Sequence, residues 1–257
     1  MVKLVSVITP AFNSALVLED CLLSVKRQGE GVEHIVIDGG SLDGTVDLLK
    51  KHEPDYQLKW ISERDSGIAE ATNKGFALAQ GEIVAWLDAD NYYQPGVIAE
   101  VVDIFNNRAV DIVYGNIEIV DWRGQLKNIY RPPSNISLAV AVQKNTGGIP
   151  PQPGVFFRKE LLDTVGGFNV GYKVAGDVDF WMKILKINPR VFYHDRLIGS
   201  YRLDAAGTSR SLKGMGRGLK EMLKIYRQYN LSLLGQVMLI KKYVYGYLKT
   251  VIVNLKK

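Results

Sequence analysis

Two aspartates separated by one small residue follow a short apolar segment in the first half of the chain. The stretch 81–91 reads GEIVAWLDADN, so Asp88 and Asp90 come directly after residues typical of a buried strand. On an extended chain their side chains point to the same side and that of Ala89 to the other. Mg²⁺ and Mn²⁺ bind carboxylate oxygens and complete their shells with water and phosphate oxygens. The pattern suggests a metal site for a diphosphate, although two acids in a solvated turn would look the same.

Two other strand-like segments end in residues suited to a nucleotide. In 6–13, SVITPAFN, Pro10 ends the strand and leaves backbone groups exposed where a nucleotide could lie. In 36–45, VIDGGSLDGT, Asp38 precedes a glycine-rich turn that enters a helix, and its carboxylate could accept the N–H of a uracil ring. Each segment alone is more often a simple turn, with Asp43 as the residue that starts the helix.

A third segment, 63–75, reads ERDSGIAEATNKG and is harder to explain as a turn. Arg64 and Lys74 offer positive charge for phosphates. Asn73 is a poor helix former in the middle of a helical segment. We therefore include this segment in the predicted site.

The elements that must position these residues alternate between strand and helix. Apolar or β-branched runs predict strands at 4–9, 33–38, 58–62 and 82–88, and helical periods predict helices at 17–28, 44–52 and 67–80. Such alternation favours a parallel sheet, whose ligand crevice lies beyond the carboxyl ends of the strands. The second block is predicted to contain a helix at 97–105, strands at 110–114 and 116–120, a loop-rich crossing at 131–154 and a helix at 177–188.

Together these segments resemble family 2 glycosyltransferases of the GT-A fold. The order and spacing of SVITPAFN, IDGGSLDGT, DSGIAEATNKG and LDAD carry the resemblance, which covers about residues 4–205. It implies an α/β fold of the GT-A type, a Rossmann-like mixed sheet flanked by helices. It also implies that the segments QPGVFFR at 152–158 and 165–181 form the acceptor side, with Asp177 as general base.

The residue chemistry and the resemblance together predict the site. In the family, the positions of Asp65, Gly67 and Asn73 line the uridine pocket, the position of Asp88 lies near the ribose, and that of Asp90 binds the metal, Mn²⁺ or Mg²⁺. The expected donor-nucleotide residues are Thr9, Pro10, Ala11, Asn13, Asp38, Gly40, Arg64, Asp65, Gly67, Asn73, Lys74, Asp88 and Ala89. Gln152, Gly176 and Trp181 are expected on the acceptor side, although a core position is favoured for the Trp181 ring.

Catalysis by Asp177 has a chemical reason and an alternative. An inverting displacement needs one carboxylate to take the proton of the acceptor hydroxyl. Asp177 and Asp179 lie two residues apart, so on a helix they point to different sides and only one can serve. Both could instead be acids favoured by the dipole at the start of a helix.

Two positions depart from the family pattern. Gly176 stands where many members carry Glu before the acidic pair. Many members carry Tyr-Arg-x-His after the last strand of the family fold, with the His as a metal or phosphate contact, and this chain has Tyr201-Arg202-Leu203-Asp204. The third metal ligand is therefore left open.

The C-terminal segment 212–257 is expected to be a basic, amphipathic helical tail on a catalytic domain of residues 1–211, itself divided into a donor half (about 1–120) and an acceptor half (about 121–211). The tail holds ten Lys or Arg and one acid, Glu221. Its apolar positions share one helical side and its basic positions the other: Leu212, Met215, Leu219, Met222, Leu223 and Tyr226 against Lys213, Arg217, Lys220, Lys224 and Arg227. It could pack on the catalytic body or lie in an anionic membrane surface, with Tyr243, Tyr245 and Tyr247 at the boundary.

Composition narrows the remaining classes. With 47% hydrophobic and 23% charged residues the chain can form a core, which excludes global disorder. A single cysteine, Cys21, excludes a disulfide framework and a Cys-rich zinc site and favours a reducing compartment. The first ten residues lack the apolar stretch and cleavage site of a signal peptide. We expect a cytoplasmic protein that could also lie at the inner face of the cytoplasmic membrane. We expect no binding to nucleic acid, and the oligomeric state is open.

The sequence thus predicts an inverting, metal-dependent hexosyl- or N-acetylhexosaminyltransferase. The expected donor is a UDP-sugar, and the expected acceptor is a saccharide or lipid-linked oligosaccharide of a bacterial cell-surface polysaccharide such as lipopolysaccharide. One alternative is a nucleotidyltransferase that makes a sugar nucleotide, but residues 9–14 lack the Gly-rich, Lys-containing phosphate loop it would need. The other is a non-catalytic nucleotide-sugar-binding subunit, which the complete set of acids disfavours.

Overall fold

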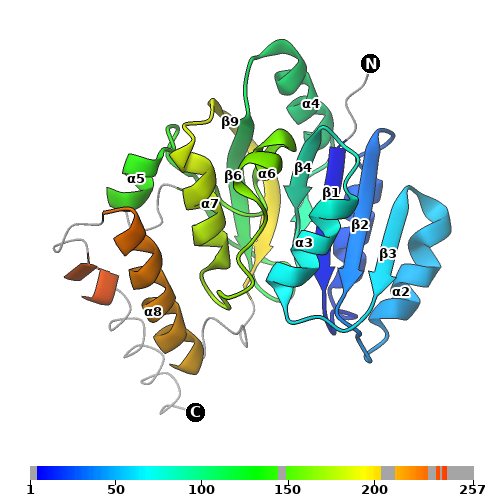
Figure 1. Ribbon diagram of the computed structural model, residues 1–257. Coiled ribbons are helices and arrows are strands. Elements are labelled where there is room, and N and C mark those ends of the chain that lie inside the picture. The colour runs from blue at the N-terminus through cyan, green and yellow to red at the C-terminus, as the bar shows by residue number, and fades with distance from the viewer. Residues whose placement is uncertain (1–4, 144–148, 204–211, 231–235, 238, 242–257) are drawn as a thin grey trace.

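The computed structural model describes residues 5–143, 149–203, 212–230, 236–237 and 239–241. Its centre is one mixed sheet with helices on both faces (Figure 1). Within the described residues the sheet has nine strands in the order β3-β2-β1-β4-β8-β6-β9-β5, and β7 pairs with β6. The predicted α/β class is confirmed.

The first half of the chain forms the parallel part of the sheet. Strand β1 pairs with β2 and β4, and β2 pairs with β3, all in parallel. The strands are β1 (Val5–Ala11), β2 (Val32–Asp38), β3 (Leu58–Ser62) and β4 (Ile83–Trp86), and the connecting helices are α1 (Leu18–Lys26), α2 (Thr45–His52), the short 3-10 helix η1 (Glu53–Asp55) and α3 (Ile68–Leu78). These bounds lie close to the predicted ranges, because β-branched or apolar residues dominate the strands and the helical periods between them are regular.

The second half adds antiparallel strands and the remaining helices. Strand β8 runs antiparallel to β4 and β6, while β9 runs parallel to β6 and antiparallel to β5. The elements are β5 (Tyr92–Tyr93), α4 (Val97–Asn107), β6 (Ile112–Val120), β7 (Leu126–Tyr130), α5 (Leu138–Gln143), β8 (Val155–Arg158), α6 (Glu160–Val165), α7 (Gly176–Lys186) and β9 (Val191–Arg202). The antiparallel strands close the sheet beside the parallel ones.

Strand β6 is a single strand where two were predicted. Its register against β9 shifts on both sides of Asn116. A Cβ on Gly115 would lie 2.6 Å from the carbonyl oxygen of His194, so only glycine allows the two strands to approach there. The apparent break at residue 115 is therefore an irregularity within one strand. The region 131–154, predicted as loop, contains helix α5, and 144–148 lie outside the described residues.

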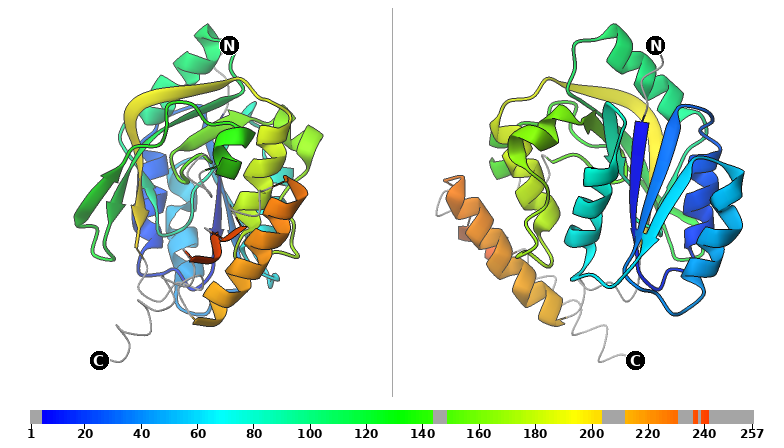
Figure 2. Two further views of the ribbon diagram at one scale, coloured as in Figure 1. Left: turned by 90° about the vertical axis from the view of Figure 1, so that its left-hand side faces the viewer. Right: turned by 45° about the vertical axis from the view of Figure 1, so that its right-hand side comes forward.

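Two apolar layers cover the two faces of the sheet (Figure 2). Helices α1, α2 and α4 pack on one face through residues such as Leu22, Leu49 and Val101. Helices α3, α6 and α7 pack on the other. Helix α3 lies very close to β1, since a Cβ on Gly75 would be 2.3 Å from Cγ2 of Ile8.

Helix α8 (Leu212–Gln228) packs beside α7 (Figures 1 and 2). Met222, Ile225 and Tyr226 are at most 3% exposed. The basic side chains Lys213, Arg217, Lys220, Lys224 and Arg227 are exposed. Helix α8 has the predicted amphipathic pattern and packs beside α7, and most of the predicted tail beyond residue 230 lies outside the described residues. Among the described helices, none has the length and apolar character needed to cross a membrane.

Candidate active site

Three predicted acids meet at one rim of the sheet. Asp88 and Asp90 follow the end of β4, and Asp177 is the second residue of α7. The pKa of Asp88 is raised to about 7, first by burial and then by the negative charges of Asp90 and Asp177. The Trp86 indole opposes this shift by donating a hydrogen bond to Asp88 Oδ1 at 3.2 Å. The electrostatic coupling shows that carboxylates 89 residues apart in sequence share one site.

A pocket of about 270 Å³ opens between Asp88 and Asp177. Its floor is aromatic, with Trp86 and Phe168 rings 4.9 Å apart and nearly perpendicular. The other lining residues are Ile68, Ala69, Thr72, Gln152, Tyr172, Lys173, Val174, Gly176 and Tyr201. An apolar floor with two carboxylates at its edge suits a sugar ring, whose faces are apolar and whose hydroxyls need acceptors.

Asp177 has the environment of a proton acceptor. Its residue remains exposed at the pocket, but protein atoms around the carboxyl desolvate it and raise the pKa of Asp177 above its ordinary value. A raised pKa makes a carboxylate a stronger base. Asp179, by contrast, is buried and lies 2.7 Å from Lys183 on the same helix, outside the pocket lining.

A second pocket of about 330 Å³ adjoins the ends of β1 and β2. Pro10, Ala11, Gly39, Asp65 and Gly67 line it together with three apolar side chains, Phe12, Ile68 and Ala71. Phe12 and Ile68 are 64% and 56% exposed, so their apolar side chains form walls at the opening of this pocket. These residues come from three of the four predicted donor segments.

Asp38 lies beneath this pocket. It is fully buried, and Oδ2 accepts hydrogen bonds from the backbone N–H groups of Gly40 and Ser41 and from the Ser62 hydroxyl. The Ser41 hydroxyl also donates to Oδ1. The carboxylate therefore shapes the turn, and Asp65 is the acid that lines the pocket beside it.

The polar atoms of Asn13 and Asn73 hold the site together. The N–H of Asn13 donates to Ser41 Oγ at 2.7 Å, and its side-chain oxygen accepts the N–H of Leu42. The Asn73 side chain donates to the carbonyl of Phe168 at 2.9 Å and accepts its N–H at 2.7 Å. Asn73 therefore occupies mid-helix because it fixes the backbone of Phe168, a wall of the sugar-sized pocket.

The two basic side chains predicted to bind phosphate, Lys74 and Arg64, differ in their surroundings. Lys74 lies 2.8 Å from Glu63 and 3.0 Å from Glu70, so two acids already balance its charge. Arg64 is exposed, and its Cγ would lie 3.3 Å from a Cβ on Gly40. Arg64 is the better placed of the two for an incoming anion.

Several other predicted side chains belong to the framework. Thr9 is buried with its hydroxyl 2.8 Å from His34 Nε2, so only its backbone faces the strand end. Gln152 donates to the Trp86 carbonyl at 2.7 Å while lining the pocket. Trp181 is 1% exposed and stacks behind Trp86 at 6.3 Å, which corrects its predicted contact with the acceptor to a core position.

Gly176 has free space above its Cα. A Cβ there would make only ordinary contacts, 3.6 Å from Phe168 and 3.9 Å from Tyr172. Glycine is therefore not required by packing. Its missing side chain leaves the pocket open beside Asp177.

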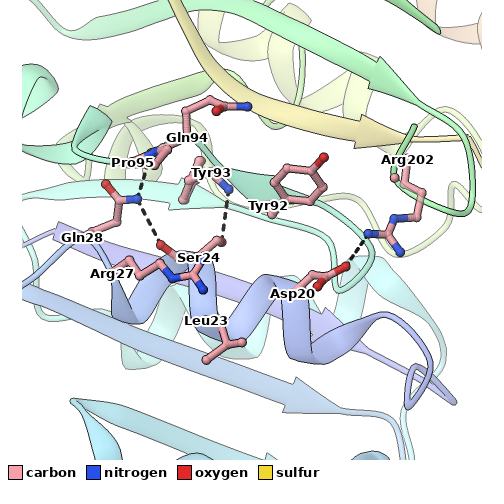
Figure 3. A pocket seen from close by; sticks show the side chains of 11 residues that line it. Asp20, Leu23, Ser24, Arg27, Gln28, Tyr92, Tyr93, Gln94, Pro95 and Arg202 are labelled. Carbon is pink, nitrogen blue, oxygen red and sulfur yellow. Dashed lines mark hydrogen bonds and ion pairs between the residues drawn. The ribbon is translucent and has the colours of Figure 1, made fainter. Parts of the chain in front are cut away.

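A third pocket of about 380 Å³ lies on the other side of Pro10. Ala89 and Asp90 line it together with Trp122, whose ring is 62% exposed, and Arg202. Figure 3 shows a further depression between α1 and β5, which Arg202 also lines. There the Arg202 guanidinium donates to Asp20 at 2.6 Å, so this side of the rim is held by an ion pair from α1.

The acids fit a divalent cation only in part. Asp88 and Asp90 provide hard oxygen ligands. The pKa of Asp88 is raised by burial first and by the charge of Asp90 second, and a cation would favour the ionised form against both. Within the described part of the chain, no three His, Cys, Asp or Glu side chains form a metal-holding group. A cation here would therefore need oxygens from a diphosphate and water. Asp204 lies outside the described residues.

Sequence reasoning missed several residues of the pocket. Tyr172, Lys173 and Val174 line it from the segment before α7. Glu221 of α8 accepts hydrogen bonds from the backbone of this segment. One signal existed, since Glu221 is the only acid in the basic tail.

Comparisons with known proteins agree with this arrangement. The family model described as Glycosyl transferase family 2 matches residues 6–166. A glycosyltransferase of PGL/p-HBAD biosynthesis from Mycobacterium bovis is 30% identical over 230 residues, covering 85% of this chain and 82% of that protein. An uncharacterized glycosyltransferase of Rickettsia conorii is 30% identical over 208 residues, and this chain spans 34% of its length.

Solved structures share the fold at low sequence identity. S. aureus TarS 1-349 in complex with UDP-GlcNAc has a TM-score of 0.70 at 18% identity, covering 96% of this chain and 73% of that chain. The mannosyltransferase PcManGT from Pyrobaculum calidifontis, in complex with GDP-Man and Mn²⁺, has a TM-score of 0.66 at 19% identity, covering 98% and 74%. The fold of this chain is that of the GT-A proteins, as predicted.

Proposed function

Because the chain belongs to glycosyl transferase family 2, we propose that it transfers a hexosyl or N-acetylhexosaminyl group from a UDP-sugar to an acceptor hydroxyl, with inversion. The observation that carries the proposal is that Asp88 and Asp177 line one pocket at the sheet rim, with Asp90 two residues from Asp88 in the lining of the adjacent pocket. A direct displacement at a sugar carbon needs one group to take the acceptor proton, which a carboxylate on the acceptor side can do, and positive charge for the leaving diphosphate, which carboxylates on the donor side can hold as a cation.

The donor base is assigned to the pocket beside Asp65. Its apolar walls, Phe12 and Ile68, suit the faces of a pyrimidine ring, and the Asp65 carboxylate suits a ring N–H. Asp38 contributes indirectly, because its carboxylate accepts hydrogen bonds from Gly40 and Ser41 and so holds the turn beside this pocket. The sugar is assigned to the pocket whose floor is Trp86 and Phe168. This pocket shares Ile68 with the pocket beside Asp65.

Asp177 is assigned the proton transfer. A hydroxyl of the acceptor enters beside Gly176, donates its proton to the Asp177 carboxylate and attacks the anomeric carbon from the face opposite the diphosphate. Tyr172 and Tyr201 border the same pocket and can orient the acceptor ring.

We assign the divalent cation, Mn²⁺ or Mg²⁺, to Asp90, with Asp88 beside the ribose. When bound, the ion supplies positive charge for the departing diphosphate. The relative PcManGT was solved with Mn²⁺, and that ion is a property of PcManGT. Arg64 supplies further positive charge from the loop before α3.

The acceptor is proposed to be a saccharide or lipid-linked oligosaccharide of a cell-surface polysaccharide. The exposed basic face of α8 could hold the protein at an anionic membrane surface on the cytoplasmic side. We retain the division into a catalytic domain, 1–211, and a tail, 212–257, as part of this proposal.

Asp177→Asn tests the catalytic assignment. Binding of UDP with Mn²⁺ should stay within about twofold of wild type, while turnover of the UDP-sugar should fall ~10²–10⁴-fold, because general-base catalysis contributes this much. Asp179→Asn is the matched control, since its carboxylate faces Lys183. Wild-type turnover in Asp177→Asn would remove Asp177 from the mechanism.

Asp90→Ala tests the metal assignment. UDP-, GDP- and dTDP-sugars are first compared by thermal stabilisation with Mn²⁺, Mg²⁺ or chelator, because a bound ligand raises the melting temperature. For the best donor, Asp90→Ala should abolish the metal-dependent part of the stabilisation. An undiminished metal effect would place the cation elsewhere.

A further inference from the structure

Glu221 of α8 binds three consecutive backbone N–H groups of a segment far away in sequence. Its Oε1 accepts from Lys173 at 3.0 Å, and its Oε2 accepts from Val174 and Ala175 at 2.9 Å each. A carboxylate that accepts several N–H groups is held strongly, because each bond is charge-assisted.

These N–H groups lie where a helix begins. Helix α7 starts at Gly176, and its N-cap residue Ala175 provides no side-chain hydrogen bond. The first N–H groups of a helix have no carbonyl partner within the helix and need one from elsewhere. A carboxylate is favoured there by the helix dipole as well. Of the three donors, Ala175 is the N-cap residue and Lys173 and Val174 precede the helix, so Glu221 anchors the segment that leads into α7 from a distant part of the chain.

The segment held by Glu221 carries the acceptor side of the pocket. Tyr172, Lys173 and Val174 line the pocket, and Asp177 follows two residues after Ala175. On its other side the Lys173 ammonium donates to the carbonyl of Ser66 at 3.0 Å, next to the donor pocket. The segment thus connects the donor loop with the tail.

The position of Glu221 is itself fixed by packing. The next residue, Met222, is 3% exposed, and Tyr226 is fully buried with its hydroxyl 3.3 Å from the carbonyl of Ala141. Lys224 lies over the Tyr172 ring at 5.5 Å. Figure 1 shows α8 running alongside α7, so a rigid helix presents the carboxylate to the segment.

We propose that Glu221 is a positioning residue for the transfer reaction: it holds residues 173–175 so that Asp177 and the acceptor wall face the sugar. The inference rests on the proposed function, in which Asp177 takes the acceptor proton. It gives helix α8 a role in the chemistry of the site in addition to its role in the core.

The experiment compares Glu221→Ala and Glu221→Gln with wild type. Glutamine keeps one oxygen acceptor and loses the charge, so its effects should be smaller than those of alanine. Glu30→Ala, the same change at an exposed turn, is the control. Three quantities are measured: amide hydrogen exchange of 173–177, affinity for UDP with Mn²⁺, and the steady-state hydrolysis of a UDP-sugar with water in place of the acceptor.

We expect Glu221→Ala to speed exchange at 173–177 and to lower kcat for hydrolysis at least ~10-fold, because displacement of a catalytic group by about 1 Å costs on the order of 100-fold. The KM for the UDP-sugar and the UDP affinity should change less than about twofold, since they depend on the donor pocket. A general loss of folding would instead change binding and exchange throughout the protein, and Glu221→Gln would then supply the folded comparison.

Two results would overturn the inference. One is unchanged exchange at 173–177 in both variants, which would show that Glu221 does not hold the segment. The other is faster exchange with unchanged kcat, which would show that holding the segment does not matter for the reaction. Failure of the proposed function looks different: wild type itself would neither bind UDP nor hydrolyse a UDP-sugar, and exchange at 173–177 would still decide whether Glu221 holds the segment.

Discussion

The buried histidine of strand β2 should make the protein lose stability as the pH falls below neutral. His34 is fully buried, and burial lowers its pKa from 6.5 to about 3. Its Nε2 lies 2.8 Å from the Thr9 hydroxyl and its Nδ1 lies 2.8 Å from the Tyr56 hydroxyl. These contacts hold the neutral ring between the core and strand β1, beneath the donor pocket.

The sign follows from the two pKa values. Between pH 6.5 and pH 3 the unfolded chain protonates this histidine and the folded protein does not. Protons therefore favour unfolding in this window, and stability falls as the pH falls. At 1.36 kcal/mol for each pKa unit, the loss from this one group is about 2 kcal/mol at pH 5 and about 3 kcal/mol at pH 4, relative to pH 8.

The measurement is urea unfolding at pH 7, 6 and 5, followed by tryptophan fluorescence, for wild type and His34→Gln. The variant should be less stable at pH 7 by about 1–3 kcal/mol, because one buried hydroxyl loses its partner. Its stability should nevertheless fall less steeply, so that the gap to wild type narrows by about 2 kcal/mol at pH 5.

His194→Gln is the control, since that ring is partly exposed and lies 2.9 Å from Glu100. It should leave the steep decline of the wild type largely in place. Parallel curves for wild type and His34→Gln between pH 7 and pH 5 would refute the reasoning, because they would mean that the buried ring accepts a proton without cost.

Three further substitutions test the packing and charge of the site. Gly75→Ala should lower the free energy of unfolding by about 1–3 kcal/mol, because the new Cβ would lie 2.3 Å from Ile8; an unchanged melting temperature would contradict the close approach. Asn73→Ala removes both hydrogen bonds to the Phe168 backbone and should lower stability by about 1–3 kcal/mol and UDP-sugar hydrolysis as well; stability and hydrolysis equal to wild type would exclude the positioning role. The pKa of Asp88 is about 7, so its ionised form destabilises the fold at pH 8. In the presence of a chelator, Asp88→Asn should therefore raise the free energy of unfolding by about 2 kcal/mol at pH 8 and by less at pH 5. A variant less stable than wild type at pH 8 would contradict this.

The donor half could be predicted because its signals are local. The strands of 5–86 are rich in apolar and β-branched residues, and polar residues follow at the carboxyl edge of the sheet. Residue types indicated Asp88 and Asp90 as a pair, and the family resemblance implied that Asp177 belongs to the same site. Long-range contacts were not needed for this part of the prediction, because the carboxyl ends of parallel strands lie at the same edge of the sheet.

The second half could not be predicted in the same way. Strand β9 reads VFYHDRLIGSYR, in which charged residues interrupt the apolar pattern, and its pairing with β6 depends on the close approach at Gly115. The hydrogen-bond partners of the polar side chains could not be predicted from the sequence either. Nothing near Asp38 or Asn73 in sequence shows that their polar atoms bind the Ser41 turn and the Phe168 backbone rather than a ligand.

The hydrogen bonds from residues 173–175 to Glu221 also set an order of events during synthesis. Glu221 leaves the ribosome 46 residues after Ala175, which at roughly 5–20 residues per second is a delay of about 2–9 s. Throughout that delay the strands β1 to β4 can already pair, while the segment 173–175 that leads into α7 lacks its carboxylate partner. A nascent chain would therefore acquire the ability to hold a nucleotide before it acquires the ability to transfer a sugar.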